Sequence, residues 1–125
     1  MINRTSLEEI IRQTRDDPEL QEAVQDALLS FEEYHTAIYS METRRMFITG
    51  AADVRQFQEE ISGMDRIRTG RHNAVLADLS MLNRLAAQLG LPPIYDGIIS
   101  EEQPYRRQAA DAVLEYVRRI ILERP

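Results

Sequence analysis

The sequence contains neither cysteine nor lysine. Without cysteine, the chain cannot form disulfide bonds, thiolate zinc sites or a cysteine nucleophile. Its 15 basic residues besides the histidines are all arginine, which excludes Schiff-base catalysis and phosphate loops that depend on lysine. Any site in this chain therefore has to work with arginine, histidine, carboxylate, amide or hydroxyl groups.

Long apolar runs are missing as well. No stretch approaches the roughly 18 consecutive apolar residues that span a bilayer, and residues 1–17 carry too many charges for a signal peptide. Internal repeats, glycine-rich phosphate loops and the alternation typical of strands are also absent. We therefore expect a cytoplasmic protein that contacts no membrane and uses no cofactor.

Positive charge is scarce, and the formal net charge is -6. Nonspecific binding to nucleic acid depends on neutralising phosphates, so nucleic acid is not an expected partner. The acidity lies in residues 1–62, which carry 13 acids and 6 arginines, whereas residues 63–125 carry 8 acids and 9 arginines. A local basic surface formed by the second half remains open.

Apolar residues that recur every three or four positions predict an all-α fold. We expect a helical bundle built on a long antiparallel hairpin, with a short N-terminal helix before it and a C-terminal helix after it. The expected bounds are 18–49 and 54–89 for the hairpin and 101–123 for the C-terminal helix. Asp17-Pro18 is a start signal and Gly50 a stop signal. The length of 125 residues indicates a single domain over 1–125.

Two glycines, Gly63 and Gly70, fall inside the second long helix. Each costs about 1 kcal/mol relative to alanine, but both project away from the apolar stripe, in line with Ala74 and Ala77. Small residues let another helix approach closely. We therefore expect a continuous central helix with neighbours on two sides.

Eleven positions between residues 54 and 89 form one helical stripe, and its two middle positions are polar. The stripe reads Val54, Phe57, Ile61, Met64, Arg68, His72, Val75, Leu79, Leu82, Ala86 and Leu89. A guanidinium and an imidazole on a buried face carry a desolvation cost unless they have partners or a use. Arg68 and His72 are therefore the first candidates for a site.

A hairpin turn at residues 51 and 52 places His35 opposite Arg68. Asp65, Arg68 and His72 are spaced i, i+3, i+7, so their side chains stack along one helix face. Glu32 stands one turn from His35. The sequence thus predicts a cross-helix polar cluster of Glu32, His35, Asp65, Arg68 and His72.

Three interpretations of this cluster remain open. The first is a buried network, inside the bundle or at a dimer interface, that fixes how the helices pair. In the second, His35, His72 and a carboxylate bind a metal ion, since Glu32-x-x-His35 has the spacing of helical metal proteins. The third is RNA cleavage: Arg66 and His72 fit a loose pattern that resembles the HEPN ribonucleases. That resemblance implies that Arg66 or Arg68 stabilises phosphorane charge while His72 transfers a proton.

A broader resemblance covers roughly residues 64–125. It is carried by Asp65-x-x-Arg68-x-x-x-His72-Asn73, Leu82-Asn83-Arg84-Leu85, Leu91-Pro92-Pro93-Ile94-Tyr95-Asp96-Gly97 and an arginine-rich last helix. These segments resemble a family of small bacterial helical domains of unknown function. The resemblance implies a cytoplasmic α-helical bundle and no catalytic residue.

The functional hypothesis is a non-catalytic interaction or regulatory module. The two long helices carry more apolar length than two short helices can cover, which favours self-association as a homodimer. A further protein partner, not identifiable from the residues, is also expected.

Overall fold

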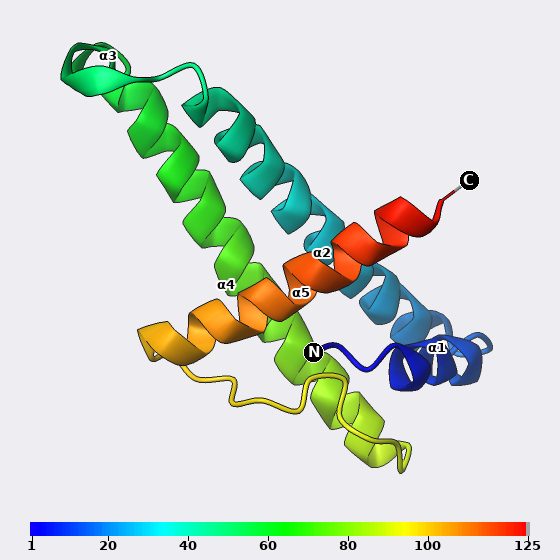
Figure 1. Ribbon diagram of the computed structural model, residues 1–125. Helices are drawn as coiled ribbons and strands as arrows, with labels where there is room; N and C mark the ends of the chain where they lie inside the picture. Colours follow the sequence, from blue (N-terminus) through cyan, green and yellow to red (C-terminus); the bar gives the residue numbers. More distant parts are fainter. Residues whose placement is uncertain (125) are drawn as a thin grey trace.

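The computed structural model describes residues 1–124, and of Ala51 only the backbone. Five α-helices lie within this range: α1 (Arg4–Gln13), α2 (Pro18–Arg45), α3 (Gly50–Gln56), α4 (Gln58–Gln88) and α5 (Gln103–Glu123). The long helices α2 and α4 form an antiparallel hairpin, and α5 crosses one face of it (Figure 1). The all-α prediction and the hairpin are thereby confirmed.

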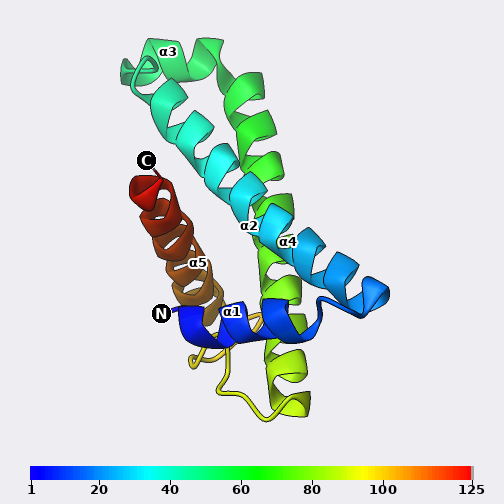
Figure 2. The ribbon, with the colours of Figure 1, turned by 90° about the vertical axis from the view of Figure 1, so that its right-hand side faces the viewer.

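The short helices gather at one end of the hairpin. Figure 2 shows α1 lying across the base of the hairpin beside α5, while the opposite end, with α3, projects beyond them. Local caps fix the starts of α1 and α2. The Asn3 side chain accepts a hydrogen bond from the Ser6 backbone N–H (3.0 Å), and Asp17 does the same for Leu20 (3.2 Å). Asp17 and Pro18 thus act as predicted.

The predicted turn of the hairpin needs correction. We expected helices at 18–49 and 54–89 joined at residues 51 and 52, but α2 ends at Arg45 and α4 begins at Gln58. The extra helix α3 begins at Gly50, whose φ of +78° interrupts the helical path. Within α3, Asp53 accepts a hydrogen bond from the Thr49 backbone N–H (3.2 Å).

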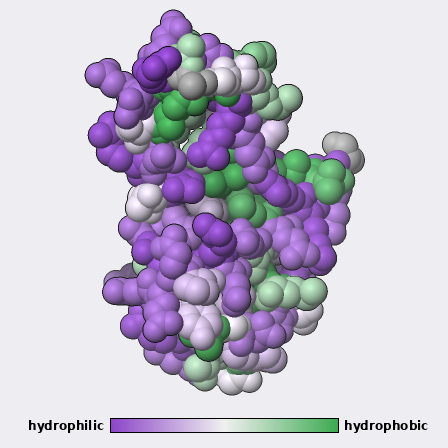
Figure 3. All heavy atoms as spheres, turned by 60° about the vertical axis from the view of Figure 1, so that its left-hand side comes forward, coloured by the Kyte–Doolittle hydropathy of each residue, from purple (hydrophilic) through white to green (hydrophobic). Residues whose placement is uncertain are grey.

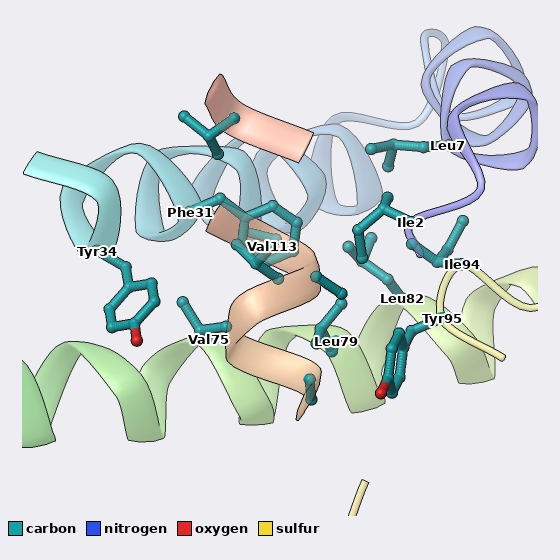
Figure 4. Packing of buried hydrophobic residues seen from close by; sticks show 14 of the residues in the cluster. Ile2, Leu7, Phe31, Tyr34, Val75, Leu79, Leu82, Ile94, Tyr95 and Val113 are labelled. Carbon is teal, nitrogen blue, oxygen red and sulfur yellow. The ribbon is translucent and has the colours of Figure 1, made fainter. Parts of the chain in front are cut away.

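The core is concentrated where α5 crosses the hairpin. Figure 4 shows Phe31 from α2, Val75 and Leu79 from α4 and Val113 from α5 in one cluster, all at most 1% exposed. The predicted apolar stripe is therefore buried over residues 75–86 of α4. Its first part is not buried: Val54, which lies in α3, is 49% exposed.

Residues 89–102 form a strap that returns the chain from α4 to α5. Gly90, with a φ of +72°, ends α4 at the predicted place. Ile94 is fully buried, and the Tyr95 backbone forms an isolated antiparallel bridge with Ile2. The Asn83 side chain bonds the Tyr95 backbone twice: its Nδ2 donates to the carbonyl oxygen and its Oδ1 accepts from the N–H, both at 3.0 Å. The strap is thus fastened both to the last part of α4 and to the segment before α1.

The helix α4 is continuous through both glycines, as predicted, but its second side is open. A Cβ added at Gly70 would meet no atom within 4 Å, and one at Gly63 would meet only the Arg66 side chain at 4.0 Å. The expectation that another helix of the chain packs there was wrong. Among residues 1–124, no helix carries an apolar stretch long enough to cross a bilayer.

Candidate functional site

The predicted polar cluster is only partly assembled by the fold. Asp65 and Arg68 lie one turn apart on α4, with a carboxylate oxygen and a guanidinium nitrogen 3.8 Å apart. Arg45 from α2 lies at the same distance from the same carboxylate. Both distances exceed a hydrogen bond. Asp65 is therefore shared loosely between two arginines.

The other two predicted members, Glu32 and His35, need correction. Glu32 accepts a hydrogen bond from Arg124 (3.3 Å), and the His35 ring stacks on Tyr39 with centroids 6.4 Å apart. The reason is the register of α2. Tyr34 is one residue earlier, about 100° away around the helix, and it is this buried side chain that faces α4.

A groove of about 410 Å³ lies between α2, α4 and α5, and it includes Arg68 and His72. Figure 3 shows apolar surface in a hollow below the free end of the hairpin, rimmed by hydrophilic residues. The volume falls in the range of about 300–1,000 Å³ typical of small-molecule sites. A second hollow, beside the chain start and the end of α5, measures about 100 Å³ and is below that range.

Positive charge lines this groove from all three helices. The charged lining residues are Arg45, Glu42, Arg68, Arg106, Arg107 and Asp111. Four arginines against two carboxylates give a formal net charge of +2, within a chain whose net charge is -6. One of the carboxylates, Glu42, also accepts a hydrogen bond from Arg118 (3.4 Å). The groove is therefore a local basic surface on an acidic protein.

His72 sits in this basic environment. Its ring lies against Tyr34 with centroids 5.8 Å apart at a tilt of 55°. Burial lowers the pKa of His72 below its ordinary value, and the guanidinium of Arg106 and then that of Arg68 lower it further. A backbone hydrogen bond with Arg106 and the carboxylate of Asp111 oppose this shift without cancelling it. The fold thus favours a neutral imidazole.

This shift predicts a pH-dependent stability. Because the pKa of His72 is depressed in the folded state, the unfolded chain binds the proton more readily. Stability from a neutral His72 is fully present above the ordinary pKa of 6.5 and is lost as the pH falls below it. When the pH is lowered from about 8 to about 5, we expect the free energy of unfolding to fall less in His72→Gln than in the wild type. Urea denaturation measures this difference. The assignment is wrong if His35→Gln flattens the profile instead.

The structure also bears on the two catalytic or metal interpretations. Arg66 is exposed and does not line the groove, so the pairing of Arg66 with His72 implied by the HEPN resemblance is not formed there. Arg68 and His72 do line it together. Among residues 1–124, no three histidine or acidic side chains are grouped closely enough to hold a metal ion. The proposed set of His35, His72 and a carboxylate is therefore not assembled.

Several groove residues were not singled out from the sequence. Arg106 and Arg107 belong to the arginine-rich last helix, and only the position of α5 across the hairpin brings them to the same groove as His72. Tyr34 carried a detectable signal, since it lies in the apolar stripe of α2 with Phe31 and Ile38. That stripe predicts that Tyr34 faces the interior of the bundle.

Comparison with known proteins bears on the family. No curated protein and no solved structure matches the chain. One family pattern, described as "Protein of unknown function (DUF3232)", matches residues 2–123. It extends the resemblance noted for residues 64–125 to α1 and α2, and it assigns no activity. The chain therefore belongs to the DUF3232 family of proteins of unknown function.

Proposed function

We propose that the chain is a non-catalytic interaction module that forms a homodimer through the free end of its hairpin. This end, called the arm here, comprises residues 39–67. The observation that carries the proposal is the exposure of large apolar side chains on the arm. Those exposed by 49–77% are Tyr39, Met46, Phe47, Val54 and Ile67. An apolar patch of this kind on a small domain is typical of an interaction surface.

The arm is exposed because the short helix α3 lies at its tip, whereas α1 and α5 pack against the base of the hairpin (Figures 1 and 2). Phe57, Ile61 and Met64 on the stripe of α4 are only half-buried. A second arm laid against the first would complete a four-helix arrangement, in which such residues become core.

The charges of the arm are compatible with a second copy of the chain. Arg44 makes a two-pronged pair with Glu60, at 2.6 and 3.0 Å, so these charges are already matched within one arm. The open face of α4 carries a row of uncharged residues that are four and three positions apart in turn. These residues are Gly63, Ile67, Gly70, Ala74 and Ala77. Small residues at such spacing permit close contact between identical helices, as a two-fold symmetric dimer requires.

Size-exclusion chromatography with light scattering tests this proposal. We expect the mass of a dimer for the wild type at micromolar concentration, and the mass of a monomer for the double variant Phe47→Ser, Ile67→Ser. Both side chains are exposed in the single chain, at 70% and 58%, so the variant is expected to keep its fold.

The matched control is Leu122→Ser, which removes an apolar side chain that is 83% exposed on α5, outside the arm. It is expected to remain dimeric. If the wild type elutes as a monomer at micromolar concentration, the proposed homodimer is wrong. A dimer disrupted by Leu122→Ser and not by the arm variant would move the interface to α5.

A further inference from the structure

We infer that the groove between α2, α4 and α5 binds a phosphate monoester that carries an apolar body. The first argument is convergence. Arg45 comes from α2, Arg68 from α4, and Arg106 and Arg107 from α5, and all four line one groove. Guanidinium groups present several N–H donors in a plane that matches phosphate oxygens, so four around one hollow suit a dianion.

The second argument is that these arginines are poorly satisfied by the protein itself. Arg45 and Arg68 share the single carboxylate of Asp65, each at 3.8 Å. Arg106 donates to the neutral side chain of Asn73. Donors therefore remain for an incoming anion.

Arginines elsewhere on the hairpin show the contrast. Arg44 binds Glu60 through two nitrogens, at 2.6 and 3.0 Å, and Arg71 binds Glu33 at 2.5 Å. Each of these has its own carboxylate at hydrogen-bonding distance. Arg45 and Arg68 thus keep more unmatched positive charge than Arg44 and Arg71, which is what a site for an external anion requires.

The third argument concerns the rest of the ligand. Between the arginines the groove is lined by the apolar side chains of Ile38, Met41 and Leu114 and by the ring of Tyr34. A free phosphate would leave this surface in contact with water, whereas an organic monoester would cover it. The volume of about 410 Å³ holds a molecule the size of a mononucleotide or a short alkyl phosphate, and it is too small for a folded partner.

Isothermal titration calorimetry of the full chain tests the site with two monoesters, AMP and octyl phosphate. We expect at least one to bind with a micromolar Kd, and inorganic phosphate and adenosine to bind at least tenfold more weakly. Preference for AMP indicates a nucleotide as the natural source of the phosphate, and preference for octyl phosphate indicates a lipid. Raising the salt concentration should weaken binding, because the contacts are charged and open to solvent.

Variants locate the binding. Arg68→Gln and Arg107→Gln each remove one guanidinium and are expected to weaken binding tenfold or more. Arg119→Gln, on the same helix as Arg107, removes the same charge outside the groove, where Arg119 pairs with Glu115 (2.7 Å). It should bind as the wild type does. Circular dichroism checks that each variant folds.

Three results would overturn the inference. In the first, neither monoester binds the wild type more tightly than millimolar. In the second, Arg119→Gln weakens binding as much as the groove variants, so that only overall charge matters. In the third, a single-stranded RNA oligonucleotide binds far more tightly than AMP and is cleaved, which would assign the groove to a nucleic acid.

Discussion

Leu79→Ala is expected to lower the free energy of unfolding by about 3–5 kcal/mol. Leu79 is fully buried on α4, in the same cluster as Phe31 of α2 and Val113 of α5. Truncation removes buried methyl groups and leaves a cavity at the point where three helices meet. Small domains have only about 5–15 kcal/mol of stability in total, so we expect the thermal midpoint to fall by about 10–20 °C.

Urea denaturation followed by circular dichroism measures this effect at a fixed protein concentration. Leu122→Ala is the matched control, because it deletes the same atoms from a leucine that is 83% exposed. It should change the unfolding free energy by less than about 0.5 kcal/mol. Equal losses in the two variants would contradict the assignment of the core to the crossing of α5 over the hairpin.

The position of this core follows from the sequence more directly than the arm does. Spacing of three and four residues identified the stripe of α4 from Val75 onward, and the caps at Asp17 and Gly90 fixed helix ends without any tertiary information. The same spacing continues to Val54, where the residues are not buried. Periodicity reports which residues share a face, but only the placement of α5 decides which part of that face is covered.

The turn shows a second limit. Gly50 was expected to end the first long helix, but α2 already ends at Arg45, and Gly50 begins the separate helix α3. At the break between α3 and α4, the Arg44 guanidinium lies over the Phe57 ring, 5.0 Å from its centroid. A contact between residues 13 positions apart cannot be read from helical spacing. Tyr34, and not His35, faces His72 because Tyr34 lies on the buried face of α2 that is turned toward α4.

From the sequence, only those residues of the site that lie on a single helix could be predicted. Asp65, Arg68 and His72 share a face of α4, and spacing alone brings them together. Arg106 and Arg107 reach the same place only because α5 crosses the hairpin at that height. The sequence could indicate that the second half of the chain holds spare positive charge, but it could not indicate that three helices point this charge into one groove.

Asn83→Ala is expected to lower the free energy of unfolding by about 2–4 kcal/mol, because two hydrogen bonds are lost and their backbone partners stay buried without a replacement. The Asn83 side chain satisfies both the N–H and the carbonyl of Tyr95, each at 3.0 Å. Tyr95 is 5% exposed, so water cannot easily replace the lost amide. Hydrogen exchange should also quicken at Ile94 and Tyr95, because the strap loses its central attachment.

Asn73→Ala is the control for this prediction, since it removes the same side chain from the same helix. Asn73 is exposed and accepts a hydrogen bond from Arg106, which water can replace, so we expect a loss below about 1 kcal/mol. If both variants lose the same stability, the Asn83–Tyr95 contact does not hold the strap. If only Asn83→Ala is destabilised, the contact explains why residues 82–85 and 91–97 stood out together in the sequence: they form one joint between α4 and the strap.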